Sequence, residues 1–293
     1  MLGNTKNWFL RCIRSGTTTA VKNRFHSPSA RAASRLSFST DVIQGPSLLR
    51  TSFDRPNPSL IHLPGLRSLP FWTQWDGNSN RVAYQDKQVT FCVEHLQKHW
   101  QTLRDEYSRV APKLQSDYEQ ATEHRTLHDG TWDWHSYMLK GKIQGHFCAH
   151  FPETTNVLQV LRDEGLLFEG TPFGYTFYST LHPKSKIAPH TAPMNFRLRI
   201  HVPLIVPNTS ATKDEELPCG IRVGPLVRPW IEGQALVLDD AYRHGVWNET
   251  DTTRVLLLVD IWHPDVNMAE RREIVEMFAA AAEQRARNAV WEG

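Results

Sequence analysis

Apolar side chains alternate with Arg197, Arg199 and His201 in the stretch 196–202. An alternation of period two is typical of a β-strand whose two faces differ. The second face of this stretch is wholly apolar, and the apolar segment 203–207 follows it. We therefore expect the cationic face to line a cavity; the alternative is a basic stripe on an outer surface.

Three further stretches, 220–223, 235–238 and 255–262, are rich in Val, Leu and Ile and predict more strands. Pro- and Gly-containing turns separate them, as in the stretch 230–233. Several short strands at this spacing indicate a sandwich or a barrel.

Helical periodicity appears in three places. Apolar or aromatic residues recur at helical spacing between 92 and 111, a second helical stretch runs from 157 to 164, and a third from 268 to 288 is rich in Ala, Glu and Arg. No internal repeat is visible. The pattern as a whole predicts a β-rich domain with flanking helices.

The length of 293 residues suits one large domain or two small ones, and 40% apolar against 22% charged residues is typical of a globular chain that can bury a core. No segment approaches the roughly 18 uninterrupted apolar residues of a spanning helix. The four cysteines form no CxxC pair, which argues against a zinc ribbon or a disulfide scaffold.

The amino-terminal segment 1–40 carries seven Lys or Arg residues, many Ser and Thr, and no Asp or Glu. This composition predicts a transit peptide for the mitochondrion; the alternative is a disordered basic tail on a cytoplasmic protein. Residues 41–80 are rich in Pro and Ser, and we interpret them as an ordered arm laid over the surface of a domain. The remaining residues, 81–293, then form the main domain.

Without the segment 1–40 the chain has 26 basic and 31 acidic residues, a net charge of about −5. This charge gives no electrostatic reason to expect a nucleic-acid partner.

Two histidines and one arginine form the candidate site. His190 precedes the alternating strand, and His244 follows the strand 235–238 after a short acidic turn, so we expect both at strand ends. A neutral imidazole is the commonest metal ligand, and Arg254 offers a planar fork for a carboxylate. Non-haem iron oxygenases usually use two His and one carboxylate, and Ala192 stands where the carboxylate is expected. With 14 histidines in the chain, a structural role for these two stays open.

An ordered series of short motifs resembles the aspartyl/asparaginyl β-hydroxylase family. The series extends over roughly residues 62–275, which makes the resemblance specific. It comprises Pro64-Gly65-Leu66, 100–106, Phe151-Pro152-Glu153-Thr154-Thr155, Tyr178-Ser179, His182-Pro183, His190, 197–204, Glu232-Gly233, Asp239-Asp240, His244-Gly245-Val246-Trp247, Arg254 and 260–264.

The resemblance implies a mainly β fold, a double-stranded β-helix of the cupin-like jelly-roll type with flanking α-helices. It also implies an Fe(II)- and 2-oxoglutarate-dependent dioxygenase that uses O2 to hydroxylate an unactivated carbon of an Asp/Asn-like peptide or small-molecule substrate, with succinate and CO2 as co-products. Animal members of the family carry glycine at the position of Ala192, so ligation by two histidines alone is in keeping with the family.

The resemblance also assigns roles to single residues. His190 and His244 match the metal ligands, Arg254 matches the arginine that pairs with the distal carboxylate of 2-oxoglutarate, and Ser179 matches the hydroxyl beside it. Arg199 and His201 match groups near the other carboxylate. Trp134 matches a tryptophan of the co-substrate pocket, and Arg197 matches an arginine that faces an acidic substrate.

Asp239 and Asp240 come shortly before His244, and either could accept a hydrogen bond from the second ring nitrogen of that histidine. The alternative is that they cap the turn. The family arginine near the amino terminus that helps to grip substrate has no counterpart here, which weakens the case for a peptide substrate.

Two other functions remain open. An alanine at the carboxylate position also occurs in related halogenases, where halide binds the iron, so C–H halogenation is one alternative. The other is a non-catalytic binding module whose metal site has decayed. Within the hydroxylase interpretation, Arg197 favours an acidic or amide-bearing small molecule or peptide as substrate.

Overall fold

The computed structural model describes residues 37–38, 59–75, 80–82, 86–118, 127–207 and 217–291. The predicted transit peptide 1–40 therefore lies outside the described residues, apart from 37–38. Contacts divide the chain into a main unit, residues 35–267, and a second unit that contains the helix α9 (Met268–Trp291). No helix among these residues combines the length and the apolar character that crossing a bilayer requires.

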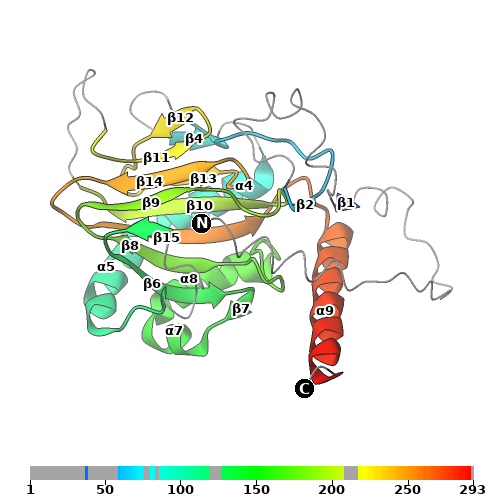
Figure 1. Ribbon diagram of the computed structural model, residues 1–293. Coiled ribbons are helices and arrows are strands. Elements are labelled where there is room, and N and C mark those ends of the chain that lie inside the picture. The colour runs from blue at the N-terminus through cyan, green and yellow to red at the C-terminus, as the bar shows by residue number, and fades with distance from the viewer. Residues whose placement is uncertain are drawn as a thin grey trace. The chain divides into compact units, whose positions relative to one another are not determined.

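Two large antiparallel sheets make up most of the β structure of the main unit (Figure 1). The six-stranded sheet has the order β13-β10-β15-β8-β6-β7, and the five-stranded sheet has the order β12-β11-β14-β9-β5. The chain crosses repeatedly between the sheets, as a jelly roll does, which confirms the predicted double-stranded β-helix. The strands are β5 (His128–Asp129), β6 (Trp132–Leu139), β7 (Lys142–Ile143), β8 (Thr176–Leu181), β9 (Ser185–His190), β10 (Arg197–Ile205), β11 (Cys219–Val223), β12 (Leu226–Arg228), β13 (Leu236–Leu238), β14 (His244–Asn248) and β15 (Arg254–Trp262).

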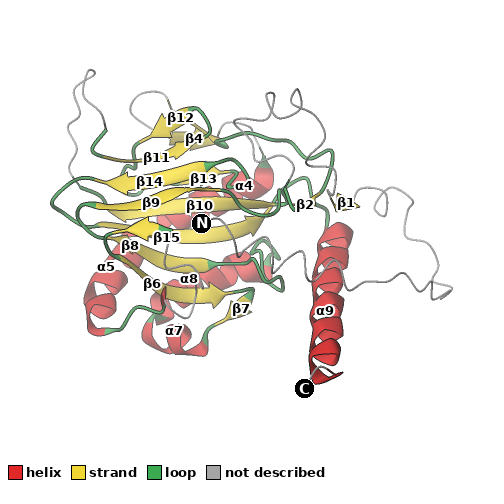
Figure 2. Ribbon diagram, viewed as in Figure 1, coloured by secondary structure: helices red, strands yellow, loops and turns green. Residues whose placement is uncertain are grey.

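Helices cover one face of the six-stranded sheet (Figure 2). They are α4 (Lys87–Lys98), α5 (Trp100–Val110), α7 (Gly145–His150) and α8 (Pro152–Asp163), with a short 3-10 turn, η1 (Ala111–Lys113). Leu198, Ile200 and Val202, the apolar face of the alternating strand, lie in the core that these helices share with the sheet. A second core of apolar side chains fills the space between the two sheets. The opposite face of β10 therefore points into the space between the sheets, as its pattern predicts.

The expected helix over 92–111 is in fact two helices, α4 and α5, which meet at His99. The backbone of His99 leaves the helical region, with φ −104° and ψ 6°. Leu96 on α4 and Leu103 on α5 are both fully buried and lie seven residues apart, so the apolar spacing stays in phase across the break. For this reason the periodicity alone could not show the break.

Part of the Pro-rich segment, residues 59–75, packs on the rest of the main unit. Trp72 is fully buried, and its backbone N–H donates to the carbonyl of Val237 at 2.8 Å. The segment contains β2 (Ile61–His62), which pairs with β1 (Ser37–Phe38), and β3 (Thr73–Trp75), which pairs with β4 (Asn80–Val82).

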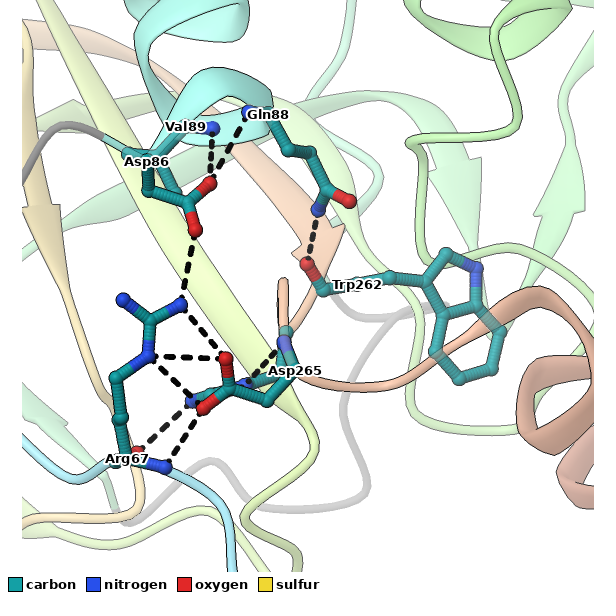
Figure 3. Close-up of polar contacts among 7 residues, drawn as sticks. Arg67, Asp86, Gln88, Val89, Trp262 and Asp265 are labelled. Carbon is teal, nitrogen blue, oxygen red and sulfur yellow. Dashed lines mark hydrogen bonds and ion pairs between the residues drawn. The ribbon is translucent and has the colours of Figure 1, made fainter.

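Arg67 links this segment to two other parts of the main unit (Figure 3). Its Nε donates to Asp265 Oδ1 at 2.9 Å, and its Nη2 donates to Asp86 Oδ2 at 2.9 Å. Asp86 also caps α4, because its Oδ1 accepts from the backbone N–H groups of Gln88 and Val89. The end of β15 and the start of α4 are thus held against the segment 59–75.

Candidate active site

The last residue of β9 and the first residue of β14 are histidines that lie side by side. The antiparallel register pairs His190 directly with His244, and their ring centroids are 4.1 Å apart. The Nδ1 of His190 lies 2.8 Å from the carbonyl oxygen of Ala188, and that of His244 lies 2.9 Å from the carbonyl oxygen of Tyr242. A carbonyl only accepts, so each Nδ1 carries the proton and each Nε2 keeps a lone pair.

Both imidazoles are held in the neutral form. Burial lowers the pKa of His244 to about 3, and the neighbouring His190 adds to this effect. Burial likewise lowers the pKa of His190 below its ordinary value. Two neutral imidazoles with available Nε2 atoms are suitable ligands for a first-row transition metal.

The described residues offer no third metal ligand at this place. They contain no group of three or more His, Cys, Asp or Glu side chains arranged to hold a metal ion. Ala192, at the expected carboxylate position, is buried, and its backbone N–H donates to the carbonyl of Asp240 at 2.8 Å. A metal bound here would keep several coordination positions for ligands that the protein does not supply.

Arg254, the first residue of β15, has a buried guanidinium. The residue is 1% exposed, and it forms no ion pair with any described residue. Its Nη1 lies 3.3 Å from Ser179 Oγ and 3.2 Å from the Ser179 carbonyl, while its Nε makes no hydrogen bond. Burial lowers the pKa of Arg254 to about 10. A buried cation of this kind is unfavourable unless a ligand supplies the missing negative charge.

The serine and the tryptophans predicted near Arg254 lie in the same region. Ser179 Oγ accepts from the indole Nε1 of Trp132 at 2.9 Å. Trp134, predicted for the co-substrate pocket, is next to Trp132 in an aromatic cluster and stacks on Phe177 with ring centroids 3.8 Å apart. Trp132, which the sequence analysis did not select, therefore makes the direct contact with Ser179. Its position two residues before Trp134, on the same face of β6, is the signal that could have identified it.

His201 also faces the space between the sheets. Its Nδ1 accepts from the indole Nε1 of Trp230 at 3.3 Å, so its Nε2 carries the proton. Burial, together with the charges of Arg199 and Arg254, lowers the pKa of His201 well below its ordinary value. His201 is therefore a neutral hydrogen-bond donor.

Arg197 and Arg199 are neutralised inside the protein. Arg199 Nε lies 2.7 Å from Asp260 Oδ1, and Arg197 Nη1 lies 3.0 Å from Asp260 Oδ2. Arg197 also pairs with Asp240 and donates to the carbonyl of Phe173. Burial alone would raise the pKa of Asp240, but the charges of Arg197 and Arg199 outweigh it and hold that pKa below its usual range. The expectation that Arg197 faces an acidic substrate is revised, because its charge is already compensated and the residue is only 4% exposed.

The two aspartates before His244 do not bond to it, because the carbonyl of Tyr242 takes its Nδ1. Asp239 Oδ1 accepts from the backbone N–H of Ala241 at 3.0 Å, so Asp239 caps the turn, as the alternative prediction stated. Asp240 instead pairs with the buried arginines.

Comparisons with known proteins identify relatives of this chain. A family model described as aspartyl/asparaginyl beta-hydroxylase matches residues 97–264, which include every residue of the candidate site. The chain is similar to the human aspartyl/asparaginyl beta-hydroxylase, with 29% identity over 217 residues, which are 74% of this chain and 26% of the human protein. It thus spans about a quarter of the length of that relative.

Two further proteins are also similar to this chain. The human aspartate beta-hydroxylase domain-containing protein 2 is 27% identical over 226 residues, which cover 76% of this chain and 55% of the relative. The ornithine lipid ester-linked acyl 2-hydroxylase of Rhizobium tropici is 44% identical over 87 residues, which cover 30% of this chain and 29% of the relative. Their names show that related proteins act on chemically different substrates.

Proposed function

Because the chain belongs to the aspartyl/asparaginyl beta-hydroxylase family, we propose that it is an iron(II)- and 2-oxoglutarate-dependent dioxygenase that hydroxylates an unactivated carbon. The observation that carries this proposal is Arg254, a guanidinium that is 1% exposed and has no acidic partner among the described residues. Such a group fits the carboxylate of a dianionic co-substrate, and a pair of metal-competent histidines lies in the same jelly roll.

His190 and His244 fit iron(II). Their protonated Nδ1 atoms are fixed by backbone carbonyls, which orient the rings and leave the Nε2 atoms for the metal. Because burial keeps both rings neutral, no proton has to leave before the metal binds at physiological pH.

The two carboxylates of 2-oxoglutarate require two separate groups of donors. We assign the distal carboxylate to Arg254 and Ser179, whose side chains already lie together. We assign the other end to the Nε2–H of His201 and to Arg199, whose Nη1 lies 3.5 Å from Asp240 and is less tightly paired than its Nε. Trp132 orients Ser179, and Trp134 contributes to the aromatic wall of this pocket.

The bound iron and co-substrate would supply the oxidising chemistry with O2, and the co-substrate would leave as succinate and CO2. The protein residues provide position and environment. Arg254 and His201 fix the co-substrate, the buried aromatic cluster excludes water, and the paired Arg197 and Arg199 hold β10 in register with β15.

For the substrate, we propose an Asp- or Asn-like group on a peptide or small molecule, in line with the names of most relatives. The higher identity with the Rhizobium protein over 87 residues supports a lipid acyl chain as the second candidate. Mass spectrometry of products from Asp-containing peptides and from ornithine lipid, each incubated with the holoenzyme, separates these candidates by which one gains the mass of oxygen.

Halogenation is the alternative reaction at this site, because Ala192 supplies no carboxylate to the metal. Chloride or bromide added to the same assay would give a halogenated product mass if this alternative holds. A product that carries only oxygen in saturating halide supports hydroxylation.

The metal site is tested by anaerobic titration of the full chain with Fe(II) and then with 2-oxoglutarate. We expect the weak visible band of the iron chelate in the wild type and its loss in His244→Ala. His150→Ala, an exposed histidine on α7, is the control and should keep the band. If the folded wild type shows no band, the protein is the non-catalytic binding module instead.

We also propose that residues 1–40 direct the chain to mitochondria, on the basis of seven basic and no acidic residues. A fluorescent protein fused after residue 40 should enter mitochondria in cells. A fusion that stays in the cytoplasm would contradict this proposal.

A further inference from the structure

An open groove of about 1280 Å³ lies over the solvent side of the five-stranded sheet. It follows β14, because residues 243–247 and Glu249 all line it. Successive side chains of a strand point to opposite faces, so Arg243, Gly245, Trp247 and Glu249 share the outer face, while His244 points between the sheets. One end of the groove therefore lies beside His244, a proposed metal ligand, and the groove extends from there along β14.

The walls and the floor of the groove come from neighbouring strands. The register places Arg222 of β11 opposite Gly245, and Lys186 of β9 opposite Trp247. Gly245 brings no side chain, and the ring of Pro189 lies 3.2 Å from the place of its missing Cβ, so Pro189 and the exposed Ala188 form the floor beside His244. The half-buried indole of Trp247 forms a flat wall further along.

Charge is distributed unevenly along this groove. At the far end, Lys186 Nζ pairs with Glu249 at 2.5 Å. At the end beside His244, Arg222 and Arg243 are both exposed, and neither makes an ion pair within the described part of the chain. The register makes them diagonal neighbours on one face, with Cα atoms about 7–8 Å apart. Two guanidinium groups without an acidic partner among the described residues thus lie at the end of the groove beside His244.

We propose that this groove is an exosite for a polypeptide substrate, in which Arg222 and Arg243 bind an acidic stretch that flanks the reacting residue. The inference deepens the proposed function and rests on it. The sequence predicted that Arg197 binds an acidic substrate, but Asp240 and Asp260 compensate its charge. We therefore assign this role to Arg222 and Arg243.

The dimensions of the groove favour a polypeptide over a small molecule. Its volume of about 1280 Å³ exceeds the roughly 300–1,000 Å³ of small-molecule pockets. The path from Arg243 to Glu249 is six residues of strand, or about 20 Å at about 3.3 Å per residue. An extended segment can lie on Ala188 and Pro189, pack against Trp247 and place carboxylates beside the two arginines.

The test is fluorescence anisotropy with the full chain and a labelled ten-residue peptide that has three adjacent glutamates in a Gly-Ser background. We expect the double variant Arg222→Glu/Arg243→Glu to lose at least tenfold in affinity. A peptide with glutamines in place of the glutamates should bind the wild type as weakly as the variant binds the acidic one. Lys113→Glu/Lys142→Glu, a double exchange of two exposed lysines on η1 and β7 outside the groove, is the charge-matched control and should bind like the wild type.

Three outcomes would overturn the proposal. One is equal affinity of the double variant and the wild type for the acidic peptide. A second is that phosphatidylserine vesicles, but not the peptide, bind in a way that depends on Arg222 and Arg243. The third concerns the acidic run 214–216, which precedes Leu217 in the groove wall. If neutralising this run makes the peptide bind more tightly, the chain's own segment occupies the groove.

The outcome is separable from that of the proposed function. Peptide binding is measured without metal or 2-oxoglutarate, whereas the proposed function is read from the iron–2-oxoglutarate band. The double variant should keep that band, because both arginines are exposed on the outer face whereas the neighbouring His244 is buried between the sheets. Loss of peptide binding with the band intact supports the exosite, and absence of the band in the wild type would overturn only the proposed function.

Discussion

Arg254 and Arg197 are buried arginines on adjacent strands of one sheet, yet they have opposite surroundings. Arg197 is 4% exposed and lies between the carboxylates of Asp240 and Asp260, while Arg254 is 1% exposed and contacts Ser179 and the face of Trp230, with no carboxylate partner among the described residues. In the first arrangement the charge of the guanidinium is compensated by these carboxylates, although its Nε makes no hydrogen bond among the described residues. The second lacks an anion, and this lack, more than burial or charge, distinguishes a ligand site from a structural ion pair.

The comparison is tested most severely by removing the carboxylate that Arg197 and Arg199 share. Asp260→Asn should lower the free energy of unfolding by about 3–5 kcal/mol, because it leaves two buried guanidinium groups short of a partner. Urea denaturation of the metal-free protein measures this loss. Asp129→Asn, an exposed aspartate on β5, is the matched control and should change stability by less than about 0.5 kcal/mol. A loss below about 1 kcal/mol for Asp260→Asn would show that the buried charge cluster is not structural.

The next largest effect is expected at the histidine pair. Mn(II) at a hundred times its dissociation constant should raise the free energy of unfolding of the wild type by about 2.7 kcal/mol. His190→Ala should abolish this gain, since one imidazole is a poor chelator. Thermal denaturation with and without Mn(II) measures it, with His182→Ala, a half-buried histidine on the loop after β8, as the control. An undiminished gain in His190→Ala would place the metal elsewhere.

Arg254→Met tests the other side of the comparison, because it removes the guanidinium that we propose binds 2-oxoglutarate. Loss of a charge-assisted pair should weaken 2-oxoglutarate binding by about 1.5–3 kcal/mol, or roughly 10- to 150-fold. The same variant should leave the metal-free protein as stable as the wild type or more so, because it removes an uncompensated buried charge. Calorimetric titration of the Mn(II) protein with 2-oxoglutarate measures the affinity.

The control for this variant is Arg228→Met. Arg228 on β12 is a partly buried arginine that also has no acidic partner among the described residues, and burial lowers its pKa too. It stacks on Phe71 and does not contact Ser179. We expect Arg228→Met to bind 2-oxoglutarate like the wild type; equal weakening in both variants would mean that the anion site is not at Arg254.

The sequence predicted which residues form the site better than it predicted which side chains on other strands pair with them. The alternating pattern of β10 correctly placed Arg197, Arg199 and His201 on one inward face, since a period of two depends only on local geometry. It could not show that Asp260, which lies 61 residues from Arg199, compensates these charges, because cross-strand register is set by the whole sheet. The spacing of Trp132 and Trp134 could have placed Trp132 on the same face of β6, but its contact with Ser179 depends on the register of the neighbouring strand.

The same comparison can be made among the histidines, where we expect a smaller effect. Each histidine of the His190–His244 pair has an available Nε2, whereas His263 has hydrogen bonds at both ring nitrogens. Both of its nitrogens are used within the protein: Nε2 donates to the carbonyl of Arg67 at 2.9 Å, and Nδ1 accepts from the backbone N–H of Asp265 at 3.2 Å. Burial lowers the pKa of His263 to about 4.

The unfolded chain therefore binds the His263 proton at a higher pH than the folded chain. Stability should fall as pH decreases from about 6.5 to about 4, by up to about 1.4 kcal/mol per pH unit from this residue. His263→Asn should reduce the slope of unfolding free energy against pH by that amount in urea titrations, both with and without Mn(II). His190→Ala should change the slope in a way that depends on Mn(II), because metal binding competes with the proton only at the pair whose Nε2 atoms are free. If Mn(II) altered the contribution of His263 as well, the distinction between a satisfied and an available histidine would fail.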